Sequence, residues 1–324
     1  MRFRKDLVLA GAILLGGALP LFIYWLWSGA HLGIQTTAAL PDVFRASSHA
    51  RQSAALFSAF GIKPVYMTLS LLAAWFLRGR REPDLMSLRR AMLAFFIGEA
   101  FCYVNIFAYH HESDLSEYLH SYGMVVALGF AAFAFLEGLE RRVLSLDDAG
   151  RKCALLGLCG RCGRNDGVDC GVIRLFQYLI PACLVLAGLP LLVEPSPVSY
   201  HTLIGRFPYH YVHSAALQLY ESRICPLFAA PLLAASWLTL VRRKRQALAW
   251  SRVLFSAGLG LLLFSYLRLL LFSPFRDDLV WFDLWEEATE LLGVASVAIF
   301  LWIFKRGLFA GAAAPARTVP PDLL

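Results

Sequence analysis

The chain has too few charged residues for a soluble protein of its length. Asp, Glu, Lys and Arg make up 16% of its 324 residues, whereas hydrophobic residues make up 58% and aromatic residues 14%. A soluble domain of this composition would have little polar surface left to face water. The composition therefore excludes a soluble globular protein and predicts that lipid is part of the solvent.

The sequence also lacks the short motifs on which many enzyme assignments depend. It contains no catalytic Ser or Cys signature, no phosphate-binding loop, no dinucleotide-binding glycine fingerprint and no C-x-x-C-H haem attachment motif. It also has no domain-sized soluble segment, repeat or low-complexity tract. Haem b held by helix-borne histidines stays open, and no specific reaction or substrate follows from these motifs.

Long apolar runs fill most of the chain. A helix needs about 20 mainly apolar residues to cross roughly 30 Å of hydrocarbon, and only a helix satisfies its own backbone hydrogen bonds there. Eight runs are candidates: residues 7–27, 63–77, 91–109, 118–139, 172–193, 226–241, 253–272 and 284–304. We therefore expect an all-α, polytopic transmembrane bundle over residues 1–309 and a flexible cytoplasmic tail over residues 310–324.

The positions of the cations predict which ends of the spans face the cytoplasm, because short cytoplasmic loops hold the excess of Lys and Arg. With the N-terminus inside, 23 of the 30 cations fall in cytoplasmic segments, six fall in outer loops, and Arg268 lies inside a span. Both termini are then cytoplasmic, in a bacterial inner membrane, and the net charge of +7 needs no nucleic acid to explain it. Residues 7–27 resemble a secretory signal, but their length and terminal aromatic residues favour a retained span.

Four of the seven cysteines cluster in the predicted cytoplasmic loop, residues 140–172. They are Cys153, Cys159, Cys162 and Cys170, spaced C-x5-C-x2-C-x7-C. Two residues between thiols let both reach one ion, and a reducing compartment disfavours a disulfide. The spacing predicts a bound metal, either structural zinc or an iron–sulfur cluster, and unligated thiols are the alternative. The other three cysteines are expected to be apolar packing residues: Cys102, Cys183 and Cys225.

All eight histidines fall on the predicted outer side of the membrane. In residues 109–123, Glu117 and His120 are three positions apart and would share one helical face. We expect an outer-face polar site that joins these two to a histidine or carboxylate of another hairpin and that could hold a second metal. The alternative is a solvated polar rim. The candidate members are His110, His111, Glu117, His120, His210, His213, Glu286, Glu287 and Glu290.

Two charged residues lie inside predicted spans. Glu99 is about nine residues into the third span, near the bilayer centre, where a carboxylate needs a partner, a cavity or an ion. Counted from the inner ends of their spans, Arg268 and Glu287 lie at the same depth. We therefore expect Arg268 to pair with Glu287, or with Glu290 one turn deeper. Snorkelling of Arg268 to the outer headgroups is the alternative.

Three classes of function remain open on this basis. The first is a metal-binding or redox subunit of a larger membrane complex, active in electron transfer, with the lipid bilayer and other subunits as its partners. The second is a membrane-embedded hydrolase in which zinc activates water. The third is a noncatalytic assembly or scaffold protein whose cysteine loop is a zinc-stabilised docking platform. We take the first as the working hypothesis.

Overall fold

A computed structural model describes residues 49–109, 113–144, 171–194, 198–204, 207–213, 215–243, 248–275 and 279–310. The helices are α3 (His49–Phe57), α4 (Lys63–Phe76), α5 (Pro83–Tyr109), α6 (Asp114–Gly138), α8 (Gly171–Leu186), α9 (Ala215–Leu219), α10 (Cys225–Arg243), α11 (Leu248–Phe275) and α12 (Leu279–Ala310). Short π-helical turns cover Ser58–Ile62, Leu139–Val143 and Tyr220–Ile224, and a 3-10 turn covers Leu189–Leu192.

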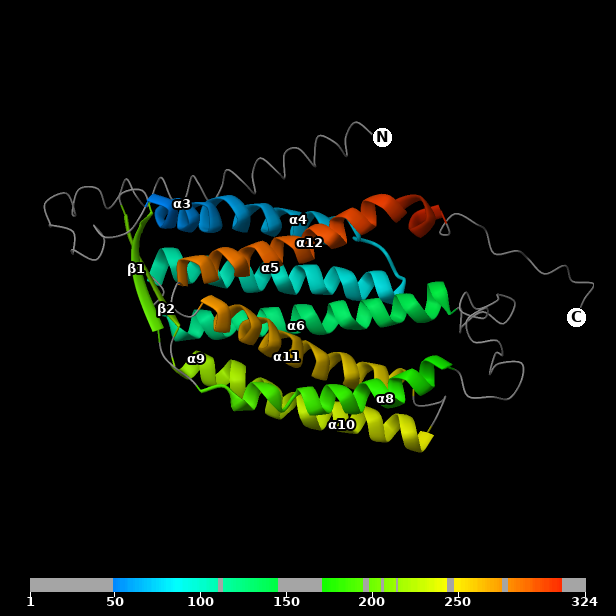
Figure 1. Cartoon of the computed structure of the whole chain (residues 1–324). Coiled ribbons are helices and arrows are strands. Elements are labelled where there is room, and N and C mark those ends of the chain that lie inside the picture. The colour runs from blue at the N-terminus through cyan, green and yellow to red at the C-terminus, as the bar shows by residue number, and fades with distance from the viewer. Residues whose placement is uncertain are drawn as a thin grey trace, which may run out of the picture.

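The long helices lie side by side in a bundle (Figure 1). Helix α5 packs along α6, and α11 lies against both α6 and α10. Helices α4 and α12 contact each other, with α4 also against α5, and α8 packs on α10. Local signals start some of these helices: Ser113 accepts a hydrogen bond from the Ser116 amide at the beginning of α6, and Pro64 occupies the first turn of α4.

Six helical segments are long and apolar enough to cross a membrane: Ser53–Phe76, Pro83–Tyr109, Leu115–Val143, Gly171–Leu192, Leu217–Arg242 and Leu248–Leu269. They correspond to the second through seventh predicted spans. The first predicted span, residues 7–27, lies outside the described residues. The eighth corresponds to α12, which is not among the six and carries Asp283, Glu286, Glu287 and Glu290 in its first turns.

Two of the six cations counted with the outer loops, Lys63 and Arg223, lie within these segments instead. Lys63 is the first residue of the predicted run 63–77 and Arg223 precedes the run 226–241, but each helix begins about nine or ten residues before its run. Hydropathy marks where a helix is apolar, whereas the helix continues for as long as its backbone bonds are formed. The loop that carries the four cysteines is described only up to Leu144, and the tail only up to Ala310.

One hairpin departs from the expected all-helical fold. Strand β1 (Val198–Ile204) pairs antiparallel with β2 (Phe207–His213), with Ile204 opposite Phe207. The hairpin lies across the end of the bundle where α6 begins (Figure 1). Its sequence, VSYHTLI followed by FPYHYVH, is rich in the β-branched and aromatic residues that favour strands. Each strand has seven residues, which is too short and too polar a stretch to cross a bilayer as a helix.

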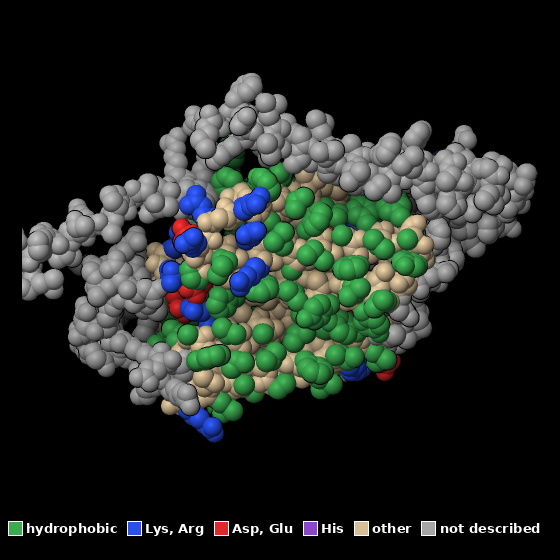
Figure 2. All heavy atoms as spheres, turned by 180° about the vertical axis from the view of Figure 1, so that it is seen from behind, with side chains coloured by type: hydrophobic (Ala, Val, Ile, Leu, Met, Phe, Trp, Pro, Cys, Tyr) green, Lys and Arg blue, Asp and Glu red, His purple; other side chains and the backbone are tan. Residues whose placement is uncertain are grey.

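Large apolar side chains cover the outside of the bundle (Figure 2). Phe135 is 72% exposed, Trp302 67% and Leu192 78%. Soluble proteins rarely expose continuous apolar surfaces of this kind, whereas a bilayer solvates them. The apolar helices and this surface are those of a multi-pass membrane protein.

Ion pairs hold three helices together at the end of the bundle opposite the hairpin. Arg142 lies 2.5 Å from Asp84 at the start of α5, and Arg252 of α11 lies 2.7 Å from Glu137 of α6. Arg252 also pairs with Glu140. Lys and Arg gather at this end in the space-filling view, next to the apolar face (Figure 2). In these ion pairs the arginines are neutralised by carboxylates, and the pairs join α5, α6 and α11 to one another at this end.

Candidate functional site: a buried charged network

Ionisable side chains are buried toward the hairpin end of the bundle. They are Lys63, Glu99, His120, Glu221, Arg268, Asp283, Glu286 and Glu287, and none of them is more than 9% exposed. An unpaired charge in such surroundings costs several kcal/mol, so these groups need partners from neighbouring helices. Contacts link seven of them into one network that joins α4, α5, α6, α11, α12 and the turn Tyr220–Ile224. The eighth, Asp283, accepts a hydrogen bond from Ser58 at 2.6 Å.

Lys63 connects three of the helices. Its Nζ lies 2.6 Å from Oε2 of Glu99 on α5 and 2.5 Å from Oε1 of Glu287 on α12, and it donates to Oη of Tyr66 at 2.8 Å. An ammonium group has three hydrogens, and the three contacts use them all. Lys63 and Tyr66 are three residues apart on α4, so both side chains leave the same helical face.

Tyr66 bridges the same two glutamates. Its Oη lies 2.6 Å from Oε2 of Glu99 and also forms a hydrogen bond with Oε2 of Glu287. A phenol has one hydrogen and can donate it to only one of two carboxyl groups. Glu99 and Glu287 therefore share the single hydroxyl of Tyr66, next to the ammonium group of Lys63.

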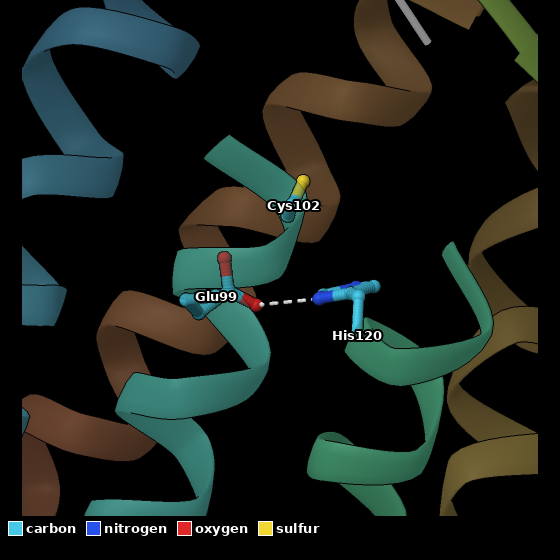
Figure 3. Close-up of side chains that lie close together, drawn as sticks. All are labelled: Glu99, Cys102 and His120. Carbon is cyan, nitrogen blue, oxygen red and sulfur yellow. Dashed lines mark ion pairs between the residues drawn. The ribbon is translucent and has the colours of Figure 1, made fainter. Parts of the chain in front are cut away.

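The second oxygen of Glu99 faces His120 on α6 (Figure 3). Nδ1 of His120 lies 3.3 Å from Oε1 of Glu99 and 3.2 Å from the Gly98 carbonyl oxygen. On the other side of the ring, Nη2 of Arg268 lies 3.5 Å from Nε2. A guanidinium can only donate, so Nε2 is the acceptor and the ring hydrogen is assigned to Nδ1. The 3.3 Å contact between Nδ1 and Oε1 of Glu99 is an ion-pair contact without hydrogen-bond geometry, and Oε1 makes no hydrogen bond among the described residues.

Arg268 of α11 connects His120 to two further carboxylates. Its Nε lies 3.3 Å from Oε1 of Glu221, and it also pairs with Glu286. Arg268 thus pairs with Glu286 and not with the expected Glu287, which pairs with Lys63 instead. Counting residues along the spans correctly placed Arg268 at the depth of the acidic residues of α12. Successive residues of a helix with 3.6 residues per turn point about 100° apart, however, so neighbours at one depth face different helices. Glu286 faces α11 and Glu287 faces α4.

Glycines set the spacing that makes these contacts. A Cβ on Gly123 of α6 would lie 2.6 Å from the Gly98 Cα of α5, and a Cβ on Gly260 of α11 would lie 2.7 Å from the Gly129 amide nitrogen of α6. Small residues let helix backbones approach closely inside membranes. Helix α6 is thus held close to both α5 and α11, and His120 reaches Glu99 on one side and Arg268 on the other.

Cys102 adds a sulfur donor to the network. It follows Glu99 by three residues on α5, so the two side chains lie on the same helical face, next to His120 (Figure 3). Glu99, Cys102 and His120 each offer one ligand atom, and the three atoms lie within 4.8 Å of one another. Glu99, Glu287 and Glu290 form a second such group. Lys63 already supplies a positive charge to two members of that second group, so the first is the better metal site.

Of the other expected members of the outer-face site on α6 and in the loops and hairpin, the structure describes only the side chain of Glu117. Glu117 accepts a hydrogen bond from Nδ2 of Asn105 at 2.6 Å, and Oδ1 of Asn105 accepts from the Ser113 amide. Glu117 therefore helps to fix the start of α6. His210 and His213 belong to strand β2, and their side chains lie outside what the structure describes. Outside the described residues altogether are His110, His111, Cys153, Cys159, Cys162 and Cys170.

Sequence reasoning missed four members of the network: Lys63, Tyr66, Cys102 and Glu221. Lys63 carries a readable signal, because it is a lone cation in a long apolar run and precedes a proline inside the helix. Glu221 carries a similar signal, an acid between two apolar stretches. Tyr66 and Cys102 carry none, since both residue types are ordinary in apolar helices.

The chain matches no protein-family model, curated protein or solved structure. The geometry of the network is therefore the basis for a functional assignment.

Proposed function

We propose that this protein binds one transition-metal ion inside its membrane bundle, through Glu99, Cys102 and His120, and works as a metal-binding or redox subunit of a membrane complex. The observation that carries the proposal is the approach of a carboxylate, a thiol and an imidazole to within 4.8 Å of one another. A bundle held together by packing alone has no need of three different metal-ligand types at one point.

The donor set favours zinc or a similar metal over magnesium or calcium. Thiol and imidazole ligands suit zinc, copper and iron, whereas magnesium and calcium prefer oxygen ligands alone. Zinc binds its protein ligands at about 2.0–2.3 Å in a tetrahedral arrangement, so donors in a tetrahedral set are about 3–4 Å apart. Three protein donors leave the fourth position for water, a substrate or a partner subunit.

Neighbouring side chains hold Glu99 in a suitable orientation. Oε2 of Glu99 is held by Lys63 and Tyr66, while Oε1 points to His120. Groups that fix the free end of a ligand commonly raise metal affinity. Binding through Nδ1 of His120 requires the hydrogen on that nitrogen to leave, so metal loading also has to rearrange the contact between His120 and Arg268.

The cysteine loop is a second proposed metal site. Cys153, Cys159, Cys162 and Cys170 are proposed to bind zinc or an iron–sulfur cluster, on the strength of their spacing. Any test of the bundle site has to remove this loop site first. Replacing all four cysteines by serine provides the required background.

The test is a cobalt titration of the detergent-purified protein in that four-serine background. We expect one bound ion per chain and the absorption band of a thiolate bound to cobalt, because Cys102 supplies the sulfur. Adding Cys102→Ser should abolish the thiolate band and weaken binding about 10- to 100-fold or more, since the thiolate provides much of the affinity.

Matched controls are Cys183→Ser and Cys225→Ser in the same background. Both cysteines are buried in the bundle, and neither belongs to a group of metal-ligand atoms among the described residues. Both variants should keep the band. If the background protein binds no cobalt, or if its thiolate band survives Cys102→Ser, the proposed site is wrong.

A zinc hydrolase is the second candidate function. Three protein ligands and an open fourth position are the arrangement of catalytic zinc sites. Zinc-dependent turnover of a chromogenic ester by the four-serine protein, lost on His120→Ala, would favour this candidate over a subunit without catalytic activity.

A further inference from the structure

A basic cleft lies at the end of the bundle opposite the hairpin. It has a volume of about 610 Å³ and is lined by Gly79, Arg80, Arg81, Glu82, Pro83 and Arg141. The chain turns between α4 and α5 at Gly79, whose φ of 82° is in the left-handed region that glycine adopts without strain. Three guanidinium groups and one carboxylate therefore line one cleft.

The cleft lies at a membrane boundary. Residues 77–82 connect the candidate spans Ser53–Phe76 and Pro83–Tyr109, so the cleft is next to the last apolar turn of α4. Trp75 is 58% exposed and Phe76 is 46% exposed on that turn, and the guanidinium of Arg78 lies 5.1 Å from the centre of the Trp75 ring. Tryptophan is enriched where hydrocarbon meets headgroups. Figure 2 shows Lys and Arg side chains at one end of the apolar face.

A ligand that suits this place has an anionic group for the arginines and an apolar chain for the surface beside Trp75 and Phe76. We propose that the cleft binds the phosphate of an anionic phospholipid, with the acyl chains lying along α4. Arginine recognises phosphate through paired N–H donors. The cleft volume is in the range of about 300–1,000 Å³ that is typical of small-molecule sites.

The proposal is independent of the metal site. The cleft residues lie at the other end of α5 from Glu99 and Cys102, and none of them contacts the buried network among the described interactions. A failure of either proposal leaves the other standing.

The test is a titration of the detergent-purified full chain with short-chain phosphatidylglycerol, followed by native mass spectrometry. Short-chain phosphatidylcholine and glycerol 3-phosphate are titrated in parallel. We expect phosphatidylglycerol to bind most tightly. Arg80→Gln together with Arg81→Gln should weaken its binding about thirtyfold, which corresponds to roughly 1 kcal/mol per arginine.

Two further variants sharpen the test. Arg174→Gln removes an exposed arginine at the start of α8 that does not line the cleft, and it should leave binding unchanged. Glu82→Gln removes the one carboxylate of the lining and should tighten phosphatidylglycerol binding about fivefold. This gain is measurable even if the double arginine variant does not fold.

Three results would overturn the proposal. They are equal binding of phosphatidylglycerol and phosphatidylcholine, glycerol 3-phosphate binding as tight as that of the lipid, and unchanged lipid affinity in Glu82→Gln or in a folded double arginine variant. The second result would assign the cleft to a soluble phosphate ligand.

Discussion

Lys63 shows how one residue can join several helices inside a membrane. Its ammonium group contacts Glu99 on α5, Glu287 on α12 and Tyr66 on its own helix, and it is only 2% exposed. A buried ion pair adds little stability compared with a well-packed apolar pair, but removal of one partner leaves a stranded charge. The network is therefore sensitive to the loss of any single member.

We expect Lys63→Met to lower the free energy of unfolding by about 3–5 kcal/mol, because two glutamates lose their cation. Adding Glu287→Gln should recover part of the loss by removing one stranded charge. Unfolding in mixed detergent micelles measures both values. The control is Arg174→Met, which removes an exposed cation and should change stability by less than about 0.5 kcal/mol. If Lys63→Met left the free energy of unfolding unchanged, Lys63 would not be the cation that neutralises Glu99 and Glu287.

The partner of Arg268 is open to a similar test. A double-mutant cycle of Arg268→Ala with Glu286→Gln should give a coupling energy of about 1–3 kcal/mol, because the two side chains form a direct ion pair. The same cycle with Glu287→Gln should give a smaller value, since Glu287 pairs with Lys63 on α4. The opposite ranking would contradict the arrangement around α11.

At the scale of elements, the approach of α5, α6 and α11 places the site. His120 reaches Glu99 and Arg268 because glycines, which have no side chain, occupy the positions where these helices cross. Apolar runs predict where the helices are, because a span must be long and apolar. They do not predict which side chains face each other, because that depends on rotation about each helix axis. This is why the depth of Arg268 could be predicted while its partner was missed.

Gly123→Ala tests the close helix contact. The added methyl carbon would lie 2.6 Å from the Gly98 Cα, so α5 and α6 must move apart at a cost of about 1–3 kcal/mol. The movement should also weaken cobalt binding in the four-serine background. Gly293→Ala is the matched control, since nothing lies within 4 Å of its added carbon and the helix should gain about 0.5–1 kcal/mol. If Gly123→Ala and Gly293→Ala changed stability and cobalt binding equally, the close contact between α5 and α6 would not be the cause of the Gly123→Ala effect.

At the scale of the whole molecule, charge and composition predict more than local motifs do. The low content of charged residues predicted a membrane bundle, and the apolar helices and apolar surface bear out that class. The group of Glu99, Cys102 and His120 was not predictable in the same way, because Cys102 looks like an apolar packing residue in the sequence. Their roles depend on contacts with residues from distant parts of the chain.

The orientation of the bundle stays a prediction that reporter fusions can test. If cytoplasmic loops hold the cations, fusions ending near residues 82 and 246 should give fluorescent protein without external phosphatase activity. A fusion ending near residue 206, in the hairpin connection, should give external phosphatase activity. The reversed pattern would place the cysteine loop outside the cytoplasm and would remove the reason for expecting reduced thiols there.

X-ray absorption spectroscopy of the zinc-loaded four-serine protein tests the metal site most directly. A site formed by Glu99, Cys102 and His120 should show one sulfur ligand at about 2.3 Å together with nitrogen or oxygen ligands at about 2.0–2.2 Å. The sulfur signal should disappear in Cys102→Ser and stay in Cys183→Ser. Zinc surrounded only by oxygen and nitrogen in the four-serine protein would contradict the account.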